Sequence, residues 1–202
     1  MSGINIMIYF LRHEERPDDV TFHTELTELG HKRSTFLSDK LKKLNITKIY
    51  CSPFLRTLQT IHPFTIHSGL KVNVDYSLSE LIKHDNIPKD VNKSFLTKND
   101  FVLPKNWYNI YNISKVYNSV TSIQSLTYPE NITDITKRVN DFINNELIKN
   151  NTNDNILICT HLGLIQFIIP ILYNSIDKNL DILKNYPMGQ LSYFSNDKLC
   201  LI

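Results

Sequence analysis

The amino-terminal apolar run, residues 4–11, is the feature that most constrains the fold of this chain. Its sequence is Ile-Asn-Ile-Met-Ile-Tyr-Phe-Leu, and it ends abruptly at Arg12 and His13. A nearly continuous apolar run of this length is typical of a strand that is buried on both faces of a parallel sheet. In α/β proteins, functional groups lie just beyond the carboxyl ends of such strands. The sequence therefore predicts that Arg12 and His13 lie at the functional edge of a sheet.

Two later segments end in the same way. Residues 46–51 are β-rich and are followed by Ser52 and Arg56, and residues 155–160 are β-rich and are followed by His161. Arginine binds phosphate through two parallel hydrogen bonds, and a neutral histidine is a competent nucleophile. One basic residue after a strand is usually a solvated surface group. Basic residues after three strands favour a single anion-binding site.

The remainder of the chain alternates between helix and strand patterns. The expected elements are helices over residues 28–43, 54–66, 135–147 and 164–172, a strand over 70–74, and a terminal hairpin of 190–194 with 198–202. This alternation predicts an α/β fold: a three-layer α/β/α sandwich with a mostly parallel central sheet. Thr27 is the expected N-cap of the first helix, and Pro170 is expected to kink or end the apolar helix.

The length and composition fit a single domain that spans residues 1–202. The chain has 202 residues and a hydrophobic fraction of 42%, enough for one sizeable core. Residues 82–130 lack clear periodicity but contain Trp107 and several tyrosines. We interpret them as a capping insertion over the site rather than as a second domain. The alternative, a disordered insert, is disfavoured by the aromatic content.

Charge and cysteine usage exclude several classes of partner and compartment. There are 22 basic and 20 acidic residues and a net charge of +2, which gives no argument for nucleic acid or membrane surfaces as partners. Three cysteines without a Cys-x-x-Cys motif favour a reducing, cytoplasmic compartment. No zinc-type spacing is present, no apolar stretch reaches the length of a membrane span, and residues 4–11 lack the flanks of a signal peptide.

Taken together, the motifs resemble those of the histidine phosphatase superfamily, which has a phosphoglycerate mutase-like fold. The motifs are Leu-Arg-His-Glu at 11–14, Leu-Thr-Glu-Leu-Gly at 26–30, Ser-Pro-Phe-Leu-Arg-Thr-Leu-Gln-Thr at 52–60 and Thr-His-Leu-Gly at 160–163. The resemblance covers residues 4–81 and 155–194 in the right order and is weak through 82–130. Glu15-Arg16-Pro17 resembles the phosphatase branch, and the mutase-type continuation after His13 is absent.

This resemblance implies a metal-independent phosphomonoester hydrolase that needs no cofactor and forms a phosphohistidine on His13. Arg12 and Arg56 are expected to clamp the non-bridging oxygens of the phosphate, and His161 is expected to be a third donor, best in its protonated form. His13 has to be neutral, with one ring nitrogen held by a nearby backbone carbonyl that fixes the tautomer.

Glu80 is the expected general acid, because a carboxylic acid beside a bound dianion has a raised pKa. Asp85 and Glu14 are the alternative acids. Ser52 is expected either to cap the helix that carries Arg56 or to touch the phosphate. The predicted substrate-binding residues are Arg16, Ser52, Glu14 and Leu162.

Glu14 departs from the superfamily pattern, which usually has glycine directly after the nucleophilic histidine. Glycine at this place allows the backbone to approach the phosphate closely. The Glu14 carboxylate is expected either to repel a dianion or to turn away and leave only a backbone contact.

Three functions remain open at this point: the phosphomonoester hydrolase, a non-catalytic phospho-ligand-binding module of the same fold, and a phosphoglycerate mutase. The expected partner is a small phosphorylated substrate or a phosphopeptide. The sequence specifies neither the physiological substrate nor the oligomeric state.

Overall fold

The computed structural model describes residues 7–18, 21–82, 98–126, 128–149, 154–173, 181–195 and 198–202. Within these residues, six strands form one sheet with the order β3-β2-β4-β1-β5-β6. The strands are β1 (Met7–Arg12), β2 (Lys48–Cys51), β3 (Val72–Val74), β4 (Asn155–Thr160), β5 (Leu191–Ser195) and β6 (Lys198–Leu201). The four strands β1 to β4 are mutually parallel, whereas β5 pairs antiparallel with β1 and β6 pairs antiparallel with β5. The predicted α/β fold with a mostly parallel sheet is therefore confirmed.

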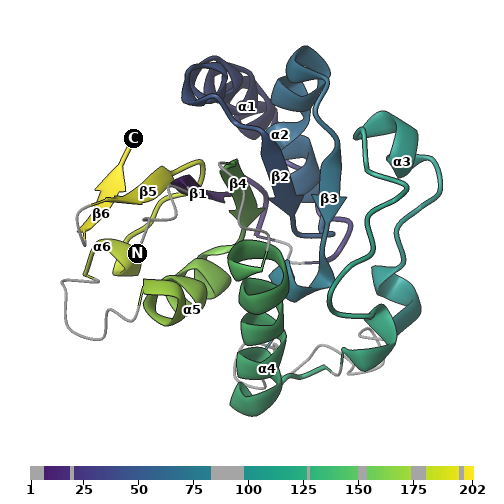
Figure 1. The fold of residues 1–202 in the computed structure, drawn as a ribbon. Helices are drawn as coiled ribbons and strands as arrows, with labels where there is room; N and C mark the ends of the chain where they lie inside the picture. Colours follow the sequence, from purple (N-terminus) through teal and green to yellow (C-terminus); the bar gives the residue numbers. More distant parts are fainter. Residues whose placement is uncertain are drawn as a thin grey trace.

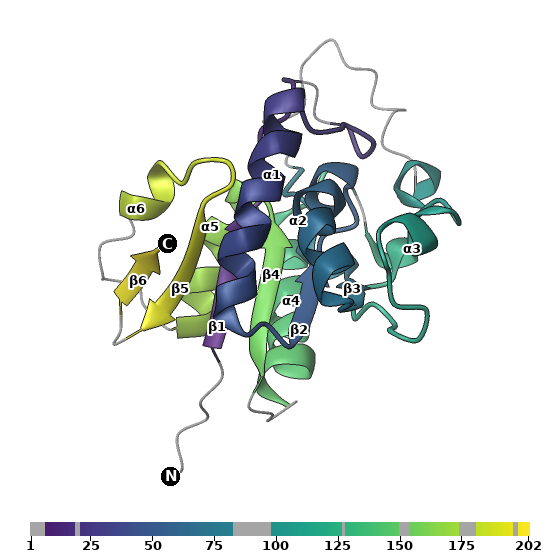
Figure 2. The same cartoon turned by 90° about the horizontal axis from the view of Figure 1, so that it is seen from above.

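Helices cover both faces of this sheet and make the three layers (Figures 1 and 2). Helices α1 (Glu28–Leu41) and α2 (Leu55–Ser68) lie on one face, and α4 (Ile132–Phe142) and α5 (Leu162–Tyr173) lie on the other. The remaining helical segments are the short helices α3 (Trp107–Ile110) and α6 (Asp181–Lys184), the 3-10 segments Lys42–Leu44, Tyr76–Leu78, Lys98–Phe101 and Ile123–Ser125, and a π-helical segment, Ile143–Ile148, that continues α4. In the described part of the chain, no helix combines the length and the apolar character that a membrane crossing needs.

Element boundaries differ from the sequence expectation in a few places. Thr27 is the N-cap of α1, as predicted, and its side chain accepts a hydrogen bond from the Gly30 amide. Helix α5 continues through Pro170 to Tyr173, so Pro170 does not end this helix, and the alternative of a kink stays a prediction. Leu164, Ile165, Ile168 and Ile169 of α5 are buried, and their packing outweighs the proline's low helix propensity. Residues 4–6 of the first predicted strand lie outside the described residues.

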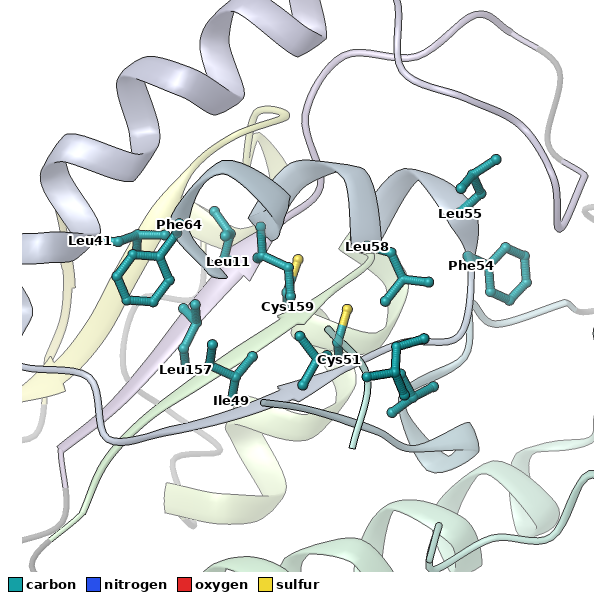
Figure 3. Close-up of a cluster of buried hydrophobic side chains, with 14 of the residues drawn as sticks. Leu11, Leu41, Ile49, Cys51, Phe54, Leu55, Leu58, Phe64, Leu157 and Cys159 are labelled. Atoms are coloured by element: carbon teal, nitrogen blue, oxygen red, sulfur yellow. The ribbon is translucent and has the colours of Figure 1, made fainter. Parts of the chain in front are cut away.

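The strands alternate their side chains between two hydrophobic cores. In β1, Leu11 points to the α1/α2 face and Phe10 to the α4/α5 face, as the period of two along a strand requires. Figure 3 shows part of the first core, in which Leu157 of the sheet lies near Phe64 of α2 and Cys51 of the sheet lies near Leu58 of α2. Burial on both faces explains why β1 and β4 have nearly continuous apolar sequences.

The register of the parallel strands places their carboxyl ends together. Arg12 of β1 pairs with Thr160 of β4, and Cys51 of β2 pairs with Cys159 of β4. The three strands therefore end within one residue of each other at the same edge of the sheet. The residues that directly follow these strands therefore lie at this edge; they are His13 after β1, Ser52 after β2 and His161 after β4.

The described part of residues 82–130 packs beside β3 and α2. Ile113 forms a parallel β-bridge with Val72, and the Trp107 indole stacks on Phe22 with ring centroids 5.9 Å apart. Residues 83–97 lie outside the described residues, so the capping role of this insertion stays a prediction.

The start of α1 lies directly against the segment that follows β1. The Thr27 amide donates to the Glu15 carbonyl at 3.0 Å. A Cβ atom on Gly30 would lie only 2.2 Å from the same carbonyl oxygen. Glycine at position 30 therefore allows the close approach that holds residues 13–16 in place.

We predict that Gly30→Ala lowers the free energy of unfolding by about 1–3 kcal/mol, because the added methyl group overlaps a backbone atom that cannot move aside freely. Urea denaturation measures the change, and His31→Ala, an exposed neighbour on α1, is the control. If Gly30→Ala and His31→Ala unfold at the same urea concentration as the wild type, the described approach of α1 is incorrect.

Candidate active site

The basic residues that the sequence places after three strands meet at one point. His13 follows β1, His161 follows β4, and their ring centroids are 5.3 Å apart with an interplanar angle of 62°. Arg56 lies in the first turn of α2, with Nη2 at 3.3 Å from His161 Nδ1. All three side chains are buried. The structure therefore brings together groups that are up to about 150 residues apart in the sequence, as a consequence of the parallel register.

The tautomer of His13 is fixed by the backbone. His13 Nδ1 lies 2.8 Å from the Glu14 carbonyl oxygen, which can only accept a hydrogen bond, so Nδ1 carries the proton. Burial, and then the charge of Arg56, lower the pKa of His13 to about 3. The imidazole is therefore neutral near pH 7, with the lone pair on Nε2. The adjacent residue, Glu14, therefore supplies the backbone carbonyl that was expected to fix the tautomer of His13.

His161 is also neutral. Burial lowers its pKa well below the ordinary value, and the charge of Arg56 acts in the same direction. Because the Arg56 guanidinium can only donate, His161 Nδ1 accepts from it, and Nε2–H donates to Ser52 Oγ at 2.8 Å. The expectation of a protonated donor at His161 concerns the phosphate-bound state, and it stays a prediction.

Backbone carbonyls orient the two arginines of the predicted clamp. Arg56 Nη1 donates to the Thr21 carbonyl at 2.9 Å, and its guanidinium lies 4.5 Å from the centroid of the Phe54 ring. Arg12 Nη1 donates to the Tyr186 carbonyl at 2.5 Å. Burial lowers the pKa of Arg12, although arginine stays charged at any physiological pH.

Arg16 contributes to the same positive region. It is partly buried, and it donates to the carbonyl of Pro17. Its charge, with those of Arg12 and Arg56, lowers the pKa of His13, so all three guanidinium groups act on the candidate nucleophile. An anion is the ligand that this field favours.

Glu80 reaches the histidine pair from the loop after β3. Its Oε2 lies 3.4 Å from His161 Nδ1, and its Oε1 accepts from the Leu81 amide at 3.1 Å. Burial raises the pKa of Glu80, which favours the protonated form, although Arg56 and Arg12 oppose this shift. Asp85, one of the alternative acids, lies outside the described residues.

The same trio could in principle hold a cation. The ligand atoms of His13, Glu80 and His161 lie within 4.8 Å of one another, and two imidazoles with a carboxylate are common metal ligands. However, the charges of Arg12 and Arg56 act at this point and oppose a divalent ion. The charge distribution is therefore better suited to an anion.

The side chain of the other alternative acid, Glu14, lies against the loop before β5. A Cβ atom on Gly189 would be only 2.1 Å from Glu14 Oε1, so the carboxyl occupies the space that this glycine leaves. Burial raises its pKa, and the nearby cations that oppose this shift are Arg33 and Lys40, both on α1. Glu14 therefore contributes its backbone carbonyl to the site, and its carboxyl lies beside Gly189.

The two other predicted substrate-binding residues have different surroundings. The N-cap of helix α2 is Phe54, so Ser52 is not the capping residue. The Ser52 hydroxyl lies 2.8 Å from His161 Nε2 and 3.5 Å from the Phe54 amide, from which it accepts a hydrogen bond. A contact between Ser52 and phosphate stays a prediction. Leu162 is partly buried and packs against the α4/α5 core. A contact between Leu162 and substrate stays a prediction.

Thr60 has a larger part in the site than its sequence position indicated. Its Oγ1 accepts from the Glu14 amide at 2.9 Å and donates to the Arg56 carbonyl at 2.7 Å. This hydroxyl thereby connects the loop of His13 to helix α2. The signal in the sequence is the Gln-Thr end of the motif at 52–60. Gly189 has no comparable signal, because its partner Glu14 is 175 residues away.

We predict that Gly189→Ala lowers the free energy of unfolding by about 1–3 kcal/mol. The added methyl group would overlap the Glu14 carboxyl, and the positive φ of 74° at this residue would add backbone strain. In a Glu14→Ala background the overlap is absent and only the backbone strain remains. Urea denaturation of the four proteins of this double-mutant cycle should therefore give costs that are not additive. Additive costs would mean that the carboxyl does not occupy the space beside Gly189.

Comparison with known proteins supports the assignment that the motifs indicated. The family description "Histidine phosphatase superfamily (branch 1)" matches residues 8–89. No curated protein matches the chain.

Several solved structures share the fold over almost the whole length. The ecdysone phosphate phosphatase from Bombix mori, solved with tungstate, is 16% identical and has a TM-score of 0.66; the match covers 98% of this chain and 92% of that one. A putative alpha-ribazole-5'-P phosphatase from Escherichia coli is 18% identical, with a TM-score of 0.62 and coverages of 98% and 95%. A phosphoserine phosphatase from Entamoeba histolytica, solved with phosphoserine, is 16% identical, with a TM-score of 0.58 and coverages of 97% and 94%. The family match covers residues 8–89, less than half of the chain, and over the described residues the chain has the fold of these structures.

Proposed function

We propose that this protein is a metal-independent phosphomonoester hydrolase that forms a phosphohistidine on His13. The observation that carries the proposal is the state of this imidazole, which is buried, neutral, and held through Nδ1 by the Glu14 carbonyl. The lone pair on Nε2 is therefore available for attack on phosphorus. Rigid support of the ring limits the reorganisation that the attack requires.

Three arginines supply the charge that a phosphate monoester needs. Such a group carries about −1.5 to −2 charges at pH 7. Arg12 and Arg56 are held by backbone carbonyls and Arg16 lies beside them, so their positions are set before substrate binds. Preorganised donors of this kind stabilise the charge on the equatorial oxygens during transfer.

The reaction then has two steps. In the first, a bond forms between His13 Nε2 and phosphorus while the bond from phosphorus to the leaving oxygen breaks, and Glu80 gives its carboxyl proton to that oxygen. In the second, water attacks phosphorus and transfers a proton to the Glu80 carboxylate, and the bond to Nε2 breaks. The products are inorganic phosphate, the alcohol or phenol, and the original neutral His13.

His161 is proposed to gain a proton when the dianion arrives. In the protein alone, burial and Arg56 keep its imidazole neutral. A bound dianion favours the charged form, as any opposite charge within a few ångströms does. Protonated His161 is then the third donor of the phosphate site, and Ser52 keeps its ring in position.

The proposed substrate is a small phosphomonoester in a reducing, cytoplasmic setting. The structural neighbours described as phosphatases of ecdysone phosphate, alpha-ribazole-5'-P and phosphoserine support a small phosphorylated molecule. Phosphopeptides are the second class to include in a substrate panel. The free thiols of Cys51, Cys159 and Cys200 support the reducing setting.

A non-catalytic binding module of the same fold is the alternative of another class. The sequence motivates it through Glu14, whose carboxylate would hinder a dianion if it faced the phosphate. The position of this carboxyl beside Gly189, near Arg33 and Lys40, removes that reason. A phosphoglycerate mutase would differ in its product, which is an isomeric phosphoglycerate rather than inorganic phosphate.

We predict that the protein hydrolyses p-nitrophenyl phosphate in the presence of a chelator, and that His13→Ala lowers kcat/KM by more than about 10³-fold. The loss of one positioned donor in such a site already costs about 10²–10³, and the loss of the nucleophile removes the covalent step itself. Release of p-nitrophenolate and of inorganic phosphate measures the reaction.

His67→Ala is the matched control, because His67 is exposed near the end of α2 and should leave turnover unchanged. Equal activity of His13→Ala and the wild type would contradict the nucleophile assignment. Thermal stabilisation by inorganic phosphate without any turnover of a phosphorylated-metabolite panel would support the binding module instead.

A further inference from the structure

A buried ion pair lies behind the segment that carries Glu80. We propose that Arg138 of α4, paired with Glu130, is a positioning residue that holds Glu80 in place to protonate the leaving group. This inference rests on the proposed function, and neither residue belongs to a motif of the sequence resemblance.

The pair has the two-pronged geometry of a strong arginine–carboxylate interaction. Arg138 Nε donates to Glu130 Oε1 at 2.6 Å, and Arg138 Nη2 donates to Glu130 Oε2 at 2.8 Å. The side chains are 4% and 2% exposed. A fork of parallel hydrogen bonds fixes the plane of the guanidinium as well as its position.

The remaining donors of this guanidinium bind the backbone directly before Glu80. Arg138 Nη1 donates to the Ser77 carbonyl at 2.5 Å, and Nη2 donates to the Ser79 carbonyl at 3.2 Å. Glu130 supports the other side of the acid, because its amide donates to the Ile82 carbonyl at 2.8 Å. The pair therefore holds carbonyls on both sides of Glu80.

A third support comes from the strand that carries His161. Thr160 Oγ1 donates to the Leu78 carbonyl at 2.7 Å. The segment from Ser79 to Ile82 has no regular secondary structure, so its backbone depends on such partners for its hydrogen bonds. The acid thus lies on a short irregular segment that is fixed from α4 and from β4.

The energetics favour a positioning role over a purely stabilising one. A buried ion pair contributes little net stability, since desolvation offsets much of its attraction, and apolar side chains of similar size are often as good. Apolar side chains could not, however, hold the Ser77 and Ser79 carbonyls in a fixed direction, as the Arg138 guanidinium does. The alignment of Glu80 with the leaving oxygen depends on that direction, and a misplacement of about 1 Å can cost about 10²-fold in rate.

The test uses the substrate dependence of general-acid catalysis. Phenolate is a strong base and needs a proton to leave, whereas p-nitrophenolate leaves without one, so defects of the acid affect phenyl phosphate more. We expect Arg138→Lys, which keeps the charge but loses the fork, to lower kcat/KM, which reports the first step, about 10-fold more for phenyl phosphate than for p-nitrophenyl phosphate. Lys137→Gln, an exposed position on the same helix, is the control.

A double-mutant cycle with Glu80→Gln separates positioning from other effects. If Arg138 acts through the acid, Arg138→Lys costs less than about threefold in the Glu80→Gln background. A cost that is equal for both substrates, or that adds in full to that of Glu80→Gln, would overturn the inference and indicate a merely structural role. Circular dichroism checks the fold, and where Arg138→Lys does not fold, Glu130→Gln enters the same cycle.

The outcomes also distinguish this inference from the proposed function. Hydrolysis that His13→Ala abolishes, without any leaving-group effect of Glu80→Gln, retains the phosphohydrolase and overturns the roles of Glu80 and Arg138. An absence of turnover by the wild-type protein overturns both proposals.

Discussion

The common end point of three parallel strands is the constraint on which the rest of this structure depends. Because β1, β4 and β2 pair in register, their carboxyl ends lie within one residue of each other at one edge of the sheet. His13 and His161 follow two of these ends, and Arg56 is brought in by the helix that follows the third. A shift of one residue in the register of β4 would turn its side chains to the other face and separate the two imidazoles.

Burial sets the protonation states at this edge, and it acts in opposite directions on the two kinds of group. It lowers the pKa of His13 and His161, and it raises the pKa of Glu80. The neutral imidazole and the protonated carboxyl are the forms that a nucleophile and a general acid require. The arginines reinforce the first effect and oppose the second, so the acid depends more on its exact surroundings. A fixed backbone on both sides of Glu80 is consistent with that dependence.

The sequence predicts the layers, the sheet and the histidine pair because these follow from local patterns. Apolar runs mark the buried strands, and the residues after the runs mark the functional edge. Groups whose role depends on distant partners could not be predicted in this way. Gly189 leaves room for Glu14, and Tyr186 offers a carbonyl to Arg12, but neither contact has a local sequence pattern.

Arg138 is intermediate between the features that a local pattern predicts and the contacts that depend on distant partners. It lies on the apolar stripe of α4 formed by Ile135, Val139 and Phe142, and a charged residue on such a stripe indicates a buried partner without naming it. The identity of the partner, Glu130, follows only from the fold. The charge state of His161 likewise depends on burial that the sequence does not show.

The most direct test of the account is the chemical identity of the phosphorylated intermediate. A reaction with excess phenyl phosphate, quenched in alkali during turnover, can be digested and analysed by mass spectrometry and ³¹P NMR. Because Nδ1 of His13 is held by the Glu14 carbonyl, the account predicts phosphate on the peptide with His13, attached to Nε2. Turnover with phosphate on His161, on Nδ1 of His13, or on no protein group would contradict it.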